Sequence, residues 1–322
     1  QCRDCVKPAL DYRPGGSVQF ALALSRFDGE GDEPLRYGYG LVASSDDHAS
    51  RAATGFKQVQ RLRRTDARGA RSEFAANRIG ATWPERLASF LYPGGTVAVH
   101  ASDRSREGIW QALQRREVYG TSGPRILLWF DLVSEPGGAH PMGTTIAPSR
   151  APAFEVRALG SFVQKPGCPE DGSRGLPAQR FEDLCQGECY HPGDTRHPIA
   201  AIEVVRIRPQ QHEGESVDSL IEDPWRSFAC EPEASGCVVR FQDEEFLEAG
   251  RDAIYYVRAL QEPTPAINGA NMRVERDARG RPISARPCYG DYRTDADDDC
   301  LAPVMERAWS SPIFVEHALP AG

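Results

Sequence analysis

The 322-residue sequence contains no apolar run long enough to cross a membrane. A membrane-spanning helix needs about 18 or more predominantly apolar residues in succession. A basic excess is also lacking, since the formal net charge is -8. Nucleic-acid binders usually carry a basic balance. We therefore expect neither a membrane span nor a nucleic-acid partner.

The chain also lacks an initiator Met and an apolar signal-peptide segment, because it begins Gln-Cys-Arg-Asp. We expect that its first residue is not the start of translation. Apolar residues make up 40% and charged residues 26% of the chain, as in ordinary globular proteins. The length allows two domains. Together, 30 Gly and 25 Pro favour many turns and short strands over a helical bundle.

The nine cysteines predict disulfide bonds. Cys230 and Cys237 flank a short turn-like loop, and Cys288 and Cys300 flank an Asp-rich one, as in local disulfides. Zinc binding is the weaker alternative, because Cys2-Arg-Asp-Cys5 has suitable spacing but no second CxxC accompanies it. Since disulfides persist in oxidising compartments, we expect a periplasmic or secreted protein.

The pairing of the other cysteines stays open. Cys168, Cys185 and Cys189 can form at most one pair among themselves, and Cys2 and Cys5 pair with each other or with a segment outside this chain. Because nine is odd, at least one thiol is free or pairs elsewhere.

Residues 1–135 show the alternation of strands and helices that indicates an α/β fold. Apolar residues recur at helical spacing over 17–27, and 37–45, 95–100 and 125–130 have strand patterns. Residues 103–116 predict a helix that begins at Asp103 or a neighbouring Ser. Its apolar face carries three residues, Ile109, Trp110 and Leu113.

Residues 136–322 predict a different architecture, with short strands separated by loops rich in Pro, Gly and Cys. This pattern is typical of an antiparallel β-sandwich. The predicted strands are 153–159, 199–208, 237–241, 253–260, 271–275 and 310–315.

Asp46 and His48 follow the predicted strand 37–45 directly. Along an extended chain they lie on the same side, while Asp47 faces away. A carboxylate and an imidazole suit a divalent transition metal, although a catalytic site needs at least one more protein ligand. The simpler alternative is that Asp46 caps the next element and that His48 is an ordinary surface residue.

The run Gly40-Leu-Val-Ala-Ser-Ser-Asp-Asp-His48 resembles the last metal-binding motif of the polymerase and histidinol phosphatase (PHP) superfamily. Residues 92–99 and 106–125 resemble a bacterial branch of it, domain-of-unknown-function family 3604, and so do later runs at 202–209, 250–265 and 306–313. The resemblance implies that residues 1–135 are the C-terminal part of a distorted (β/α)7 barrel. Residues 136–322 would then be a disulfide-containing, β-rich domain.

The first part of the PHP motif set is missing from this sequence. Such barrels begin with a strand that ends in His-x-His, but no two of the seven histidines stand one residue apart. We therefore expect the N-terminal remainder of the same protein to supply the other ligands.

The resemblance implies a cluster of two or three divalent ions, Zn, Mn or Fe, held in this chain by Asp46 and His48. Such a cluster activates water for hydrolysis. Arg125, in the turn after the predicted helix, and Thr121 are candidates for contacting an anionic small-molecule substrate. His100, at the end of strand 95–100, is a weaker candidate for substrate or metal contact. A surface ion pair for Arg125 and a structural role for His100 are the alternatives.

Two charged stretches each allow a structural and a functional interpretation. The basic residues between Arg51 and Arg71 could line a substrate entrance, but a solvated loop is the preferred interpretation. Residues 295–306 carry acids at four positions of a calcium-binding loop. However, Cys300 occupies the position that needs Gly, so an acidic turn closed by a disulfide is the preferred interpretation.

Together these features predict a PHP-type metal-dependent hydrolase, most plausibly a phosphoesterase. The alternative function is a non-catalytic module that binds a glycan or a protein, with the barrel remnant as its scaffold.

Overall fold

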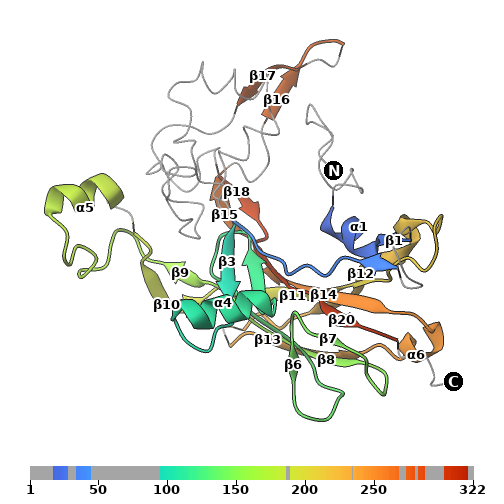
Figure 1. Ribbon diagram of the computed structural model, residues 1–322. Coiled ribbons are helices and arrows are strands. Elements are labelled where there is room, and N and C mark those ends of the chain that lie inside the picture. Colours follow the sequence, from blue (N-terminus) through green and yellow to red (C-terminus); the bar gives the residue numbers. More distant parts are fainter. Residues whose placement is uncertain are drawn as a thin grey trace.

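The computed structural model describes residues 17–27, 34–44, 95–185, 189–233, 235–267, 273–279, 282–286 and 301–317. Most of them lie in β-strands or in the loops between strands (Figure 1). The described helices are α1 (Val18–Ala23), α4 (Arg106–Gln114), α5 (Ala178–Cys185), α6 (Phe246–Ala249) and the 3-10 helix η5 (Val217–Leu220).

The larger sheet has eight strands and joins segments from the whole described chain. Its main path runs in the order β12-β11-β14-β19-β4-β3, and β20 and β7 extend it beside β14. All its pairs are antiparallel except β20 with β7. Its strands are β12 (Ile221–Ala229), β11 (Ile199–Ile207), β14 (Ala253–Gln261), β19 (Arg307–Ser310), β4 (Val118–Thr121), β3 (Thr96–Val99), β20 (Ile313–Val315) and β7 (Thr145–Ile146).

The second large sheet has four antiparallel strands in the order β13-β8-β5-β6. These strands are β13 (Cys237–Gln242), β8 (Ala153–Leu159), β5 (Leu127–Leu132) and β6 (His140–Pro141). Every second residue of β5 is buried, as expected of a strand with one face on the core. Four short two-stranded ribbons complete the description: β1 (Ser25–Arg26) with β2 (Leu35–Arg36), β9 (Phe162–Gln164) with β10 (Pro192–Arg196), β15 (Thr264–Ile267) with β18 (Leu301–Val304), and β16 (Arg273–Arg276) with β17 (Pro282–Arg286).

The main core lies between the two large sheets. Phe154 of β8 stacks on Phe130 and Phe241 and packs against Tyr255 of β14, with ring centroids 4.8–5.4 Å apart. A second apolar cluster, on the other face of β11 and β14, is covered by α1 through Leu22. Strand β14 is therefore buried almost throughout.

The prediction of an α/β barrel is wrong. Strands β3 and β4 flank α4 in sequence but pair antiparallel, with Thr96 opposite Thr121 and Val99 opposite Val118. A (β/α) barrel requires parallel neighbours joined by right-handed crossovers. Within the described residues no barrel closes, and the fold is β-rich.

Several local predictions also need correction. The predicted strand 37–45 is not formed over the described residues 37–44, where the only nearby strand is β2 at Leu35–Arg36. The predicted helix 17–27 is shorter and ends at Ala23. Helix α4 forms as predicted and is capped by Ser105, but its buried residues are Gly108 and Ala112, not the expected apolar face.

Two disulfides lie within the described residues. Cys230–Cys237 is confirmed, and of the three possible pairs among Cys168, Cys185 and Cys189 the structure contains Cys168–Cys189. The predicted bond Cys288–Cys300 and the residues Cys2 and Cys5 lie outside the described residues. In the described part of the chain, no helix has the length and apolar character needed to cross a membrane.

Candidate functional site

The turn Thr121–Arg125 lies at one end of the larger sheet, where β4 leaves β3 and β19. Thr121 is buried, and its Oγ1 accepts a hydrogen bond from the Gly123 amide at 3.2 Å. Thr96 of β3 donates to the Gly123 carbonyl, also at 3.2 Å. Thr121 therefore shapes the turn from inside.

Ser122 in this turn contacts a buried carboxylate that the sequence did not reveal. Its Oγ donates to Glu306 Oε2 at 2.5 Å and accepts from the Arg307 amide at 2.9 Å. Glu306 is only 1% exposed. A buried carboxylate needs hydrogen-bond partners, so this contact fixes the turn to β19. The two residues are 184 positions apart, and no spacing rule could have joined them.

Arg125 is the exposed residue of the turn. Its guanidinium carbon lies 3.7 Å from the centroid of the Tyr190 ring, a close cation–π contact. Tyr190 follows Cys189, whose disulfide to Cys168 fastens this part of the chain. This contact restricts the orientations of the guanidinium, whose planar fork of donors suits an anion.

The segment that leads to Asp46 and His48 reaches the same end of the sheet. The Gly95 amide donates to the Ser44 carbonyl at 2.8 Å. A Cβ on Gly95 would lie 2.5 Å from Ala43 Cβ and 2.6 Å from the Thr121 carbonyl oxygen, so this close approach requires glycine. Asp46 and His48 themselves lie outside the described residues.

His100 lies at the other end of β3 from Gly95. Its amide donates to the Glu117 carbonyl and its Nε2 to the Leu128 carbonyl, both at 2.9 Å. The ring packs beside Tyr119 and Trp129. The structure therefore does not bring His100 together with the Thr121–Arg125 turn.

A half-buried aspartate on β5, Asp131, interacts electrostatically with His100. Burial raises the pKa of Asp131, while the positive charges of Arg157 and His100 oppose that shift. The pair Arg157–Asp131 spans 3.7 Å between Nη2 and Oδ2. His100 forms hydrogen bonds to two carbonyl groups, and the nearby Asp131 has an ion-pair partner, which is typical of a structural histidine.

Among the described residues, no group of three or more His, Cys, Asp or Glu side chains is arranged to hold a metal ion. The basic stretch between Arg51 and Arg71 and most of the acidic stretch 295–306 lie outside the residues that the structure describes. Both therefore stay predictions.

Comparison with protein families gives one match, and it spans the turn and both predicted metal ligands. Residues 26–131 match the family described as "Protein of unknown function (DUF3604)". The match covers less than half of the chain, and the family description names no activity. Neither a curated protein nor a solved structure matches the chain.

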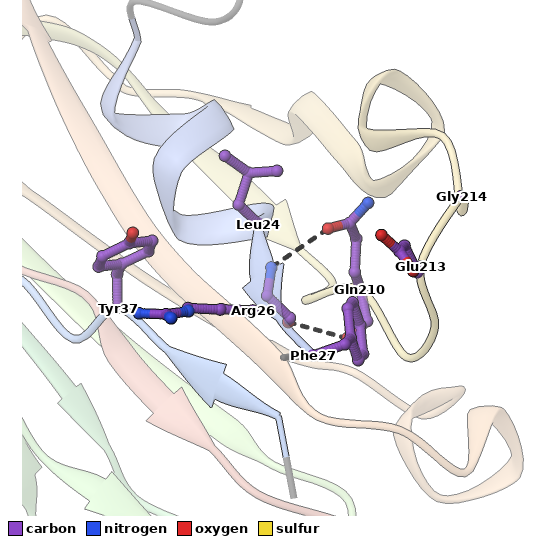
Figure 2. A pocket seen from close by; sticks show the side chains of 8 residues that line it. Leu24, Arg26, Phe27, Tyr37, Gln210, Glu213 and Gly214 are labelled. Atoms are coloured by element: carbon purple, nitrogen blue, oxygen red, sulfur yellow. Dashed lines mark hydrogen bonds between the residues drawn. The ribbon is translucent and has the colours of Figure 1, made fainter. Parts of the chain in front are cut away.

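A separate pocket lies at the start of the DUF3604-like stretch (Figure 2). It has a volume of about 430 Å³, within the range of small-molecule sites. Its walls come from the end of α1, from β1, from Tyr37 and from the loop that follows β11. No sequence motif marks this pocket, because its lining residues are of ordinary types and come from three separate segments of the chain.

Proposed function

We propose that this protein is a metal-dependent hydrolase of the PHP type that acts on phosphoesters. Asp46 and His48 would supply two metal ligands, and other parts of the protein would supply the rest. Their carboxylate and imidazole suit Zn, Mn or Fe, so the donor set fits such an ion. When bound, the metal cluster would lower the pKa of water and polarise the ester.

The observation that carries this proposal is the contact between Ser44 and Gly95 beside Thr121. Asp46 follows Ser44 by two residues, so chain connectivity keeps its Cα within about 7 Å of the Ser44 Cα. The same sheet end presents Arg125, whose guanidinium suits a phosphoryl or carboxylate oxygen. Arg125 would orient the anionic substrate next to the metal ligands.

The match of residues 26–131 to DUF3604 agrees with the family resemblance from which the proposal starts, and the matched stretch includes Asp46, His48 and Arg125. The proposal does not include the predicted (β/α)7 barrel, because the described fold is β-rich. Residues 37–44 are not a strand, so strand geometry no longer gives a reason for Asp46 and His48 to lie on the same side. The proposal therefore rests on the motif and on the position of Ser44.

We also propose that the protein works in the periplasm or outside the cell. Disulfides Cys168–Cys189 and Cys230–Cys237 favour an oxidising compartment.

Hydrolysis of bis(p-nitrophenyl) phosphate and p-nitrophenyl phosphate by the full-length gene product, with Mn²⁺ or Zn²⁺, tests the function. Asp46→Ala and His48→Ala should each lower kcat about 100-fold or more, because each removes a ligand of the metal that would activate the water. Asp47→Asn is the matched control and should keep the wild-type rate. Activity that survives both ligand substitutions, or no activity on either ester, would refute the proposal.

A further inference from the structure

The loop 209–216, which forms one wall of the pocket in Figure 2, is fastened tightly to the end of α1 and to β1. Gln210 is 8% exposed, and its backbone and side-chain polar groups all form hydrogen bonds, either to α1 and β1 or within the loop. Its amide donates to the Ala23 carbonyl, and its Nε2 donates to the Glu215 carbonyl. Its Oε1 and its carbonyl oxygen accept from the amide and the hydroxyl of Ser25.

A second set of contacts fixes both ends of the same loop. Arg251 donates to the Pro209 carbonyl at 2.7 Å and to both carboxylate oxygens of Glu215. Glu215 in turn accepts from the Gln211 amide at 2.8 Å. The hydrogen bond from Arg251 is the main reason that the pKa of Glu215 lies below its ordinary value. The wall is therefore formed in advance of any ligand, which lowers the entropic cost of binding.

The opposite wall is aromatic and accessible. Tyr37 stacks on Tyr39 with ring centroids 5.5 Å apart and an interplanar angle of 15°. The two residues are 46% and 39% exposed. Figure 2 shows Arg26 extending toward Tyr37 on one side of the pocket and Glu213 standing on the other side. An exposed aromatic stack beside a pocket is typical of a recognition surface.

We infer that this pocket binds a sugar ring of an uncharged glycan. The face of Tyr37 suits the apolar C–H face of a pyranose, and polar groups at the rim suit its hydroxyls. The exposed Glu213 carboxylate in the lining can accept hydrogen bonds from hydroxyl groups. An anionic ligand fits less well, because the Glu213 carboxylate would repel it, and a fully apolar ligand would cover that carboxylate without offering it a hydrogen bond.

A glycan array carrying bacterial, plant and animal oligosaccharides, probed with the full-length protein, tests this inference. Wild type should bind at least one neutral glycan. Tyr37→Ala and Glu213→Ala should each weaken that binding about tenfold or more, while Tyr37→Phe should retain most of it. Trp110→Ala is the matched control: it removes another exposed aromatic ring, on α4, and should bind like wild type.

Absence of binding to every neutral glycan, or equal binding by wild type, Tyr37→Ala and Glu213→Ala, would overturn the inference. Circular dichroism of each variant separates loss of binding from loss of folding. The inference is independent of the hydrolase proposal, since Asp46→Ala and treatment with a chelator should leave glycan binding unchanged. A result against one proposal therefore leaves the other standing.

Discussion

Arg206, on β11, is a charged side chain in the interior of the protein, with only 3% of its surface exposed. It donates to both oxygens of Glu222 at 2.6 and 2.9 Å and to Asp243 Oδ2 at 2.7 Å. Its guanidinium carbon lies 4.3 Å from the centroid of the Trp225 ring. Burial alone would lower the pKa of Arg206, but the two carboxylates outweigh that effect and keep it charged.

Replacing Arg206 with Met should lower the free energy of unfolding by about 3–5 kcal/mol, because Asp243 would keep a buried charge without its cation. The double variant Arg206→Met/Asp243→Asn should recover much of this loss, since Tyr255 can still donate to position 243. Urea denaturation measures both. In the control Arg240→Met, which breaks the exposed ion pair with Glu155, the loss should be below about 1 kcal/mol. Equal losses for the two single variants would contradict this account.

We expect the folded protein to lose stability at alkaline pH because of the buried tyrosines Tyr119 and Tyr256. Burial raises the pKa of Tyr119 and of Tyr256 to about 12, from an ordinary value of 10.0. The unfolded chain releases these protons first, so the stabilisation is complete below pH 10 and is lost as pH rises toward 12. Each group accounts for up to about 2–3 kcal/mol.

The free energy of unfolding, measured in urea at intervals from pH 8 to pH 11.5, should fall steeply above pH 10. Tyr119→Phe/Tyr256→Phe should show a shallower fall, although it starts from a lower value because two hydrogen bonds are lost. Curves of the same slope for wild type and the double variant would show that these residues do not cause the alkaline loss.

Helix α4 shows how an amphipathic pattern can indicate a helix and still mislead about its buried face. Ile109, Trp110 and Leu113 are 38%, 56% and 40% exposed, whereas Ala112 is fully buried. The helix links two antiparallel strands at the edge of the larger sheet, and its buried residues are the small Gly108 and Ala112. The sequence pattern therefore predicts the helix and its N-cap, but not which face of the helix is buried.

Trp110→Ala should lower the free energy of unfolding by less than about 1 kcal/mol, because most of the ring is already in water. Ala112→Leu should cost about 1–3 kcal/mol, since a larger side chain does not fit at this fully buried position. Thermal unfolding of both variants, beside wild type, measures the difference. If the Trp110 substitution were the more damaging of the two, the buried face would be the one that the sequence pattern suggested.

Strands with continuous or alternating apolar residues were predictable, whereas an edge strand that contains proline and charged residues was not. Strand β8 has the bounds predicted from its sequence, and β14 differs by one residue. Strand β12 was missed because it contains Asp223, Pro224 and Arg226. It lies at the edge of the larger sheet, where proline and charged residues are tolerated.

The whole architecture could not be read from local patterns. A strand, a helix and a strand in succession occur both in parallel crossovers and in antiparallel pairs, and the periodicity of side chains does not encode strand direction. The long-range pairing of β4 with β19 decides the outcome here, because it places β4 inside an antiparallel sheet. Likewise, Arg125 could be chosen as a candidate from the sequence of segment 106–125. The contact between Ser122 and Glu306 could not be predicted, because only the folded sheet brings these two residues together.

For the whole molecule, the central proposal is that Asp46 and His48 bind a metal near the end of the larger sheet where Ser44 and Thr121 lie. Elemental analysis of the intact full-length protein tests it most directly. Wild type and Asp47→Asn should carry about one or more equivalents of Zn, Mn or Fe, and Asp46→Ala and His48→Ala should lose most of this metal. Less than one equivalent in wild type, unchanged by either substitution, would contradict the claim.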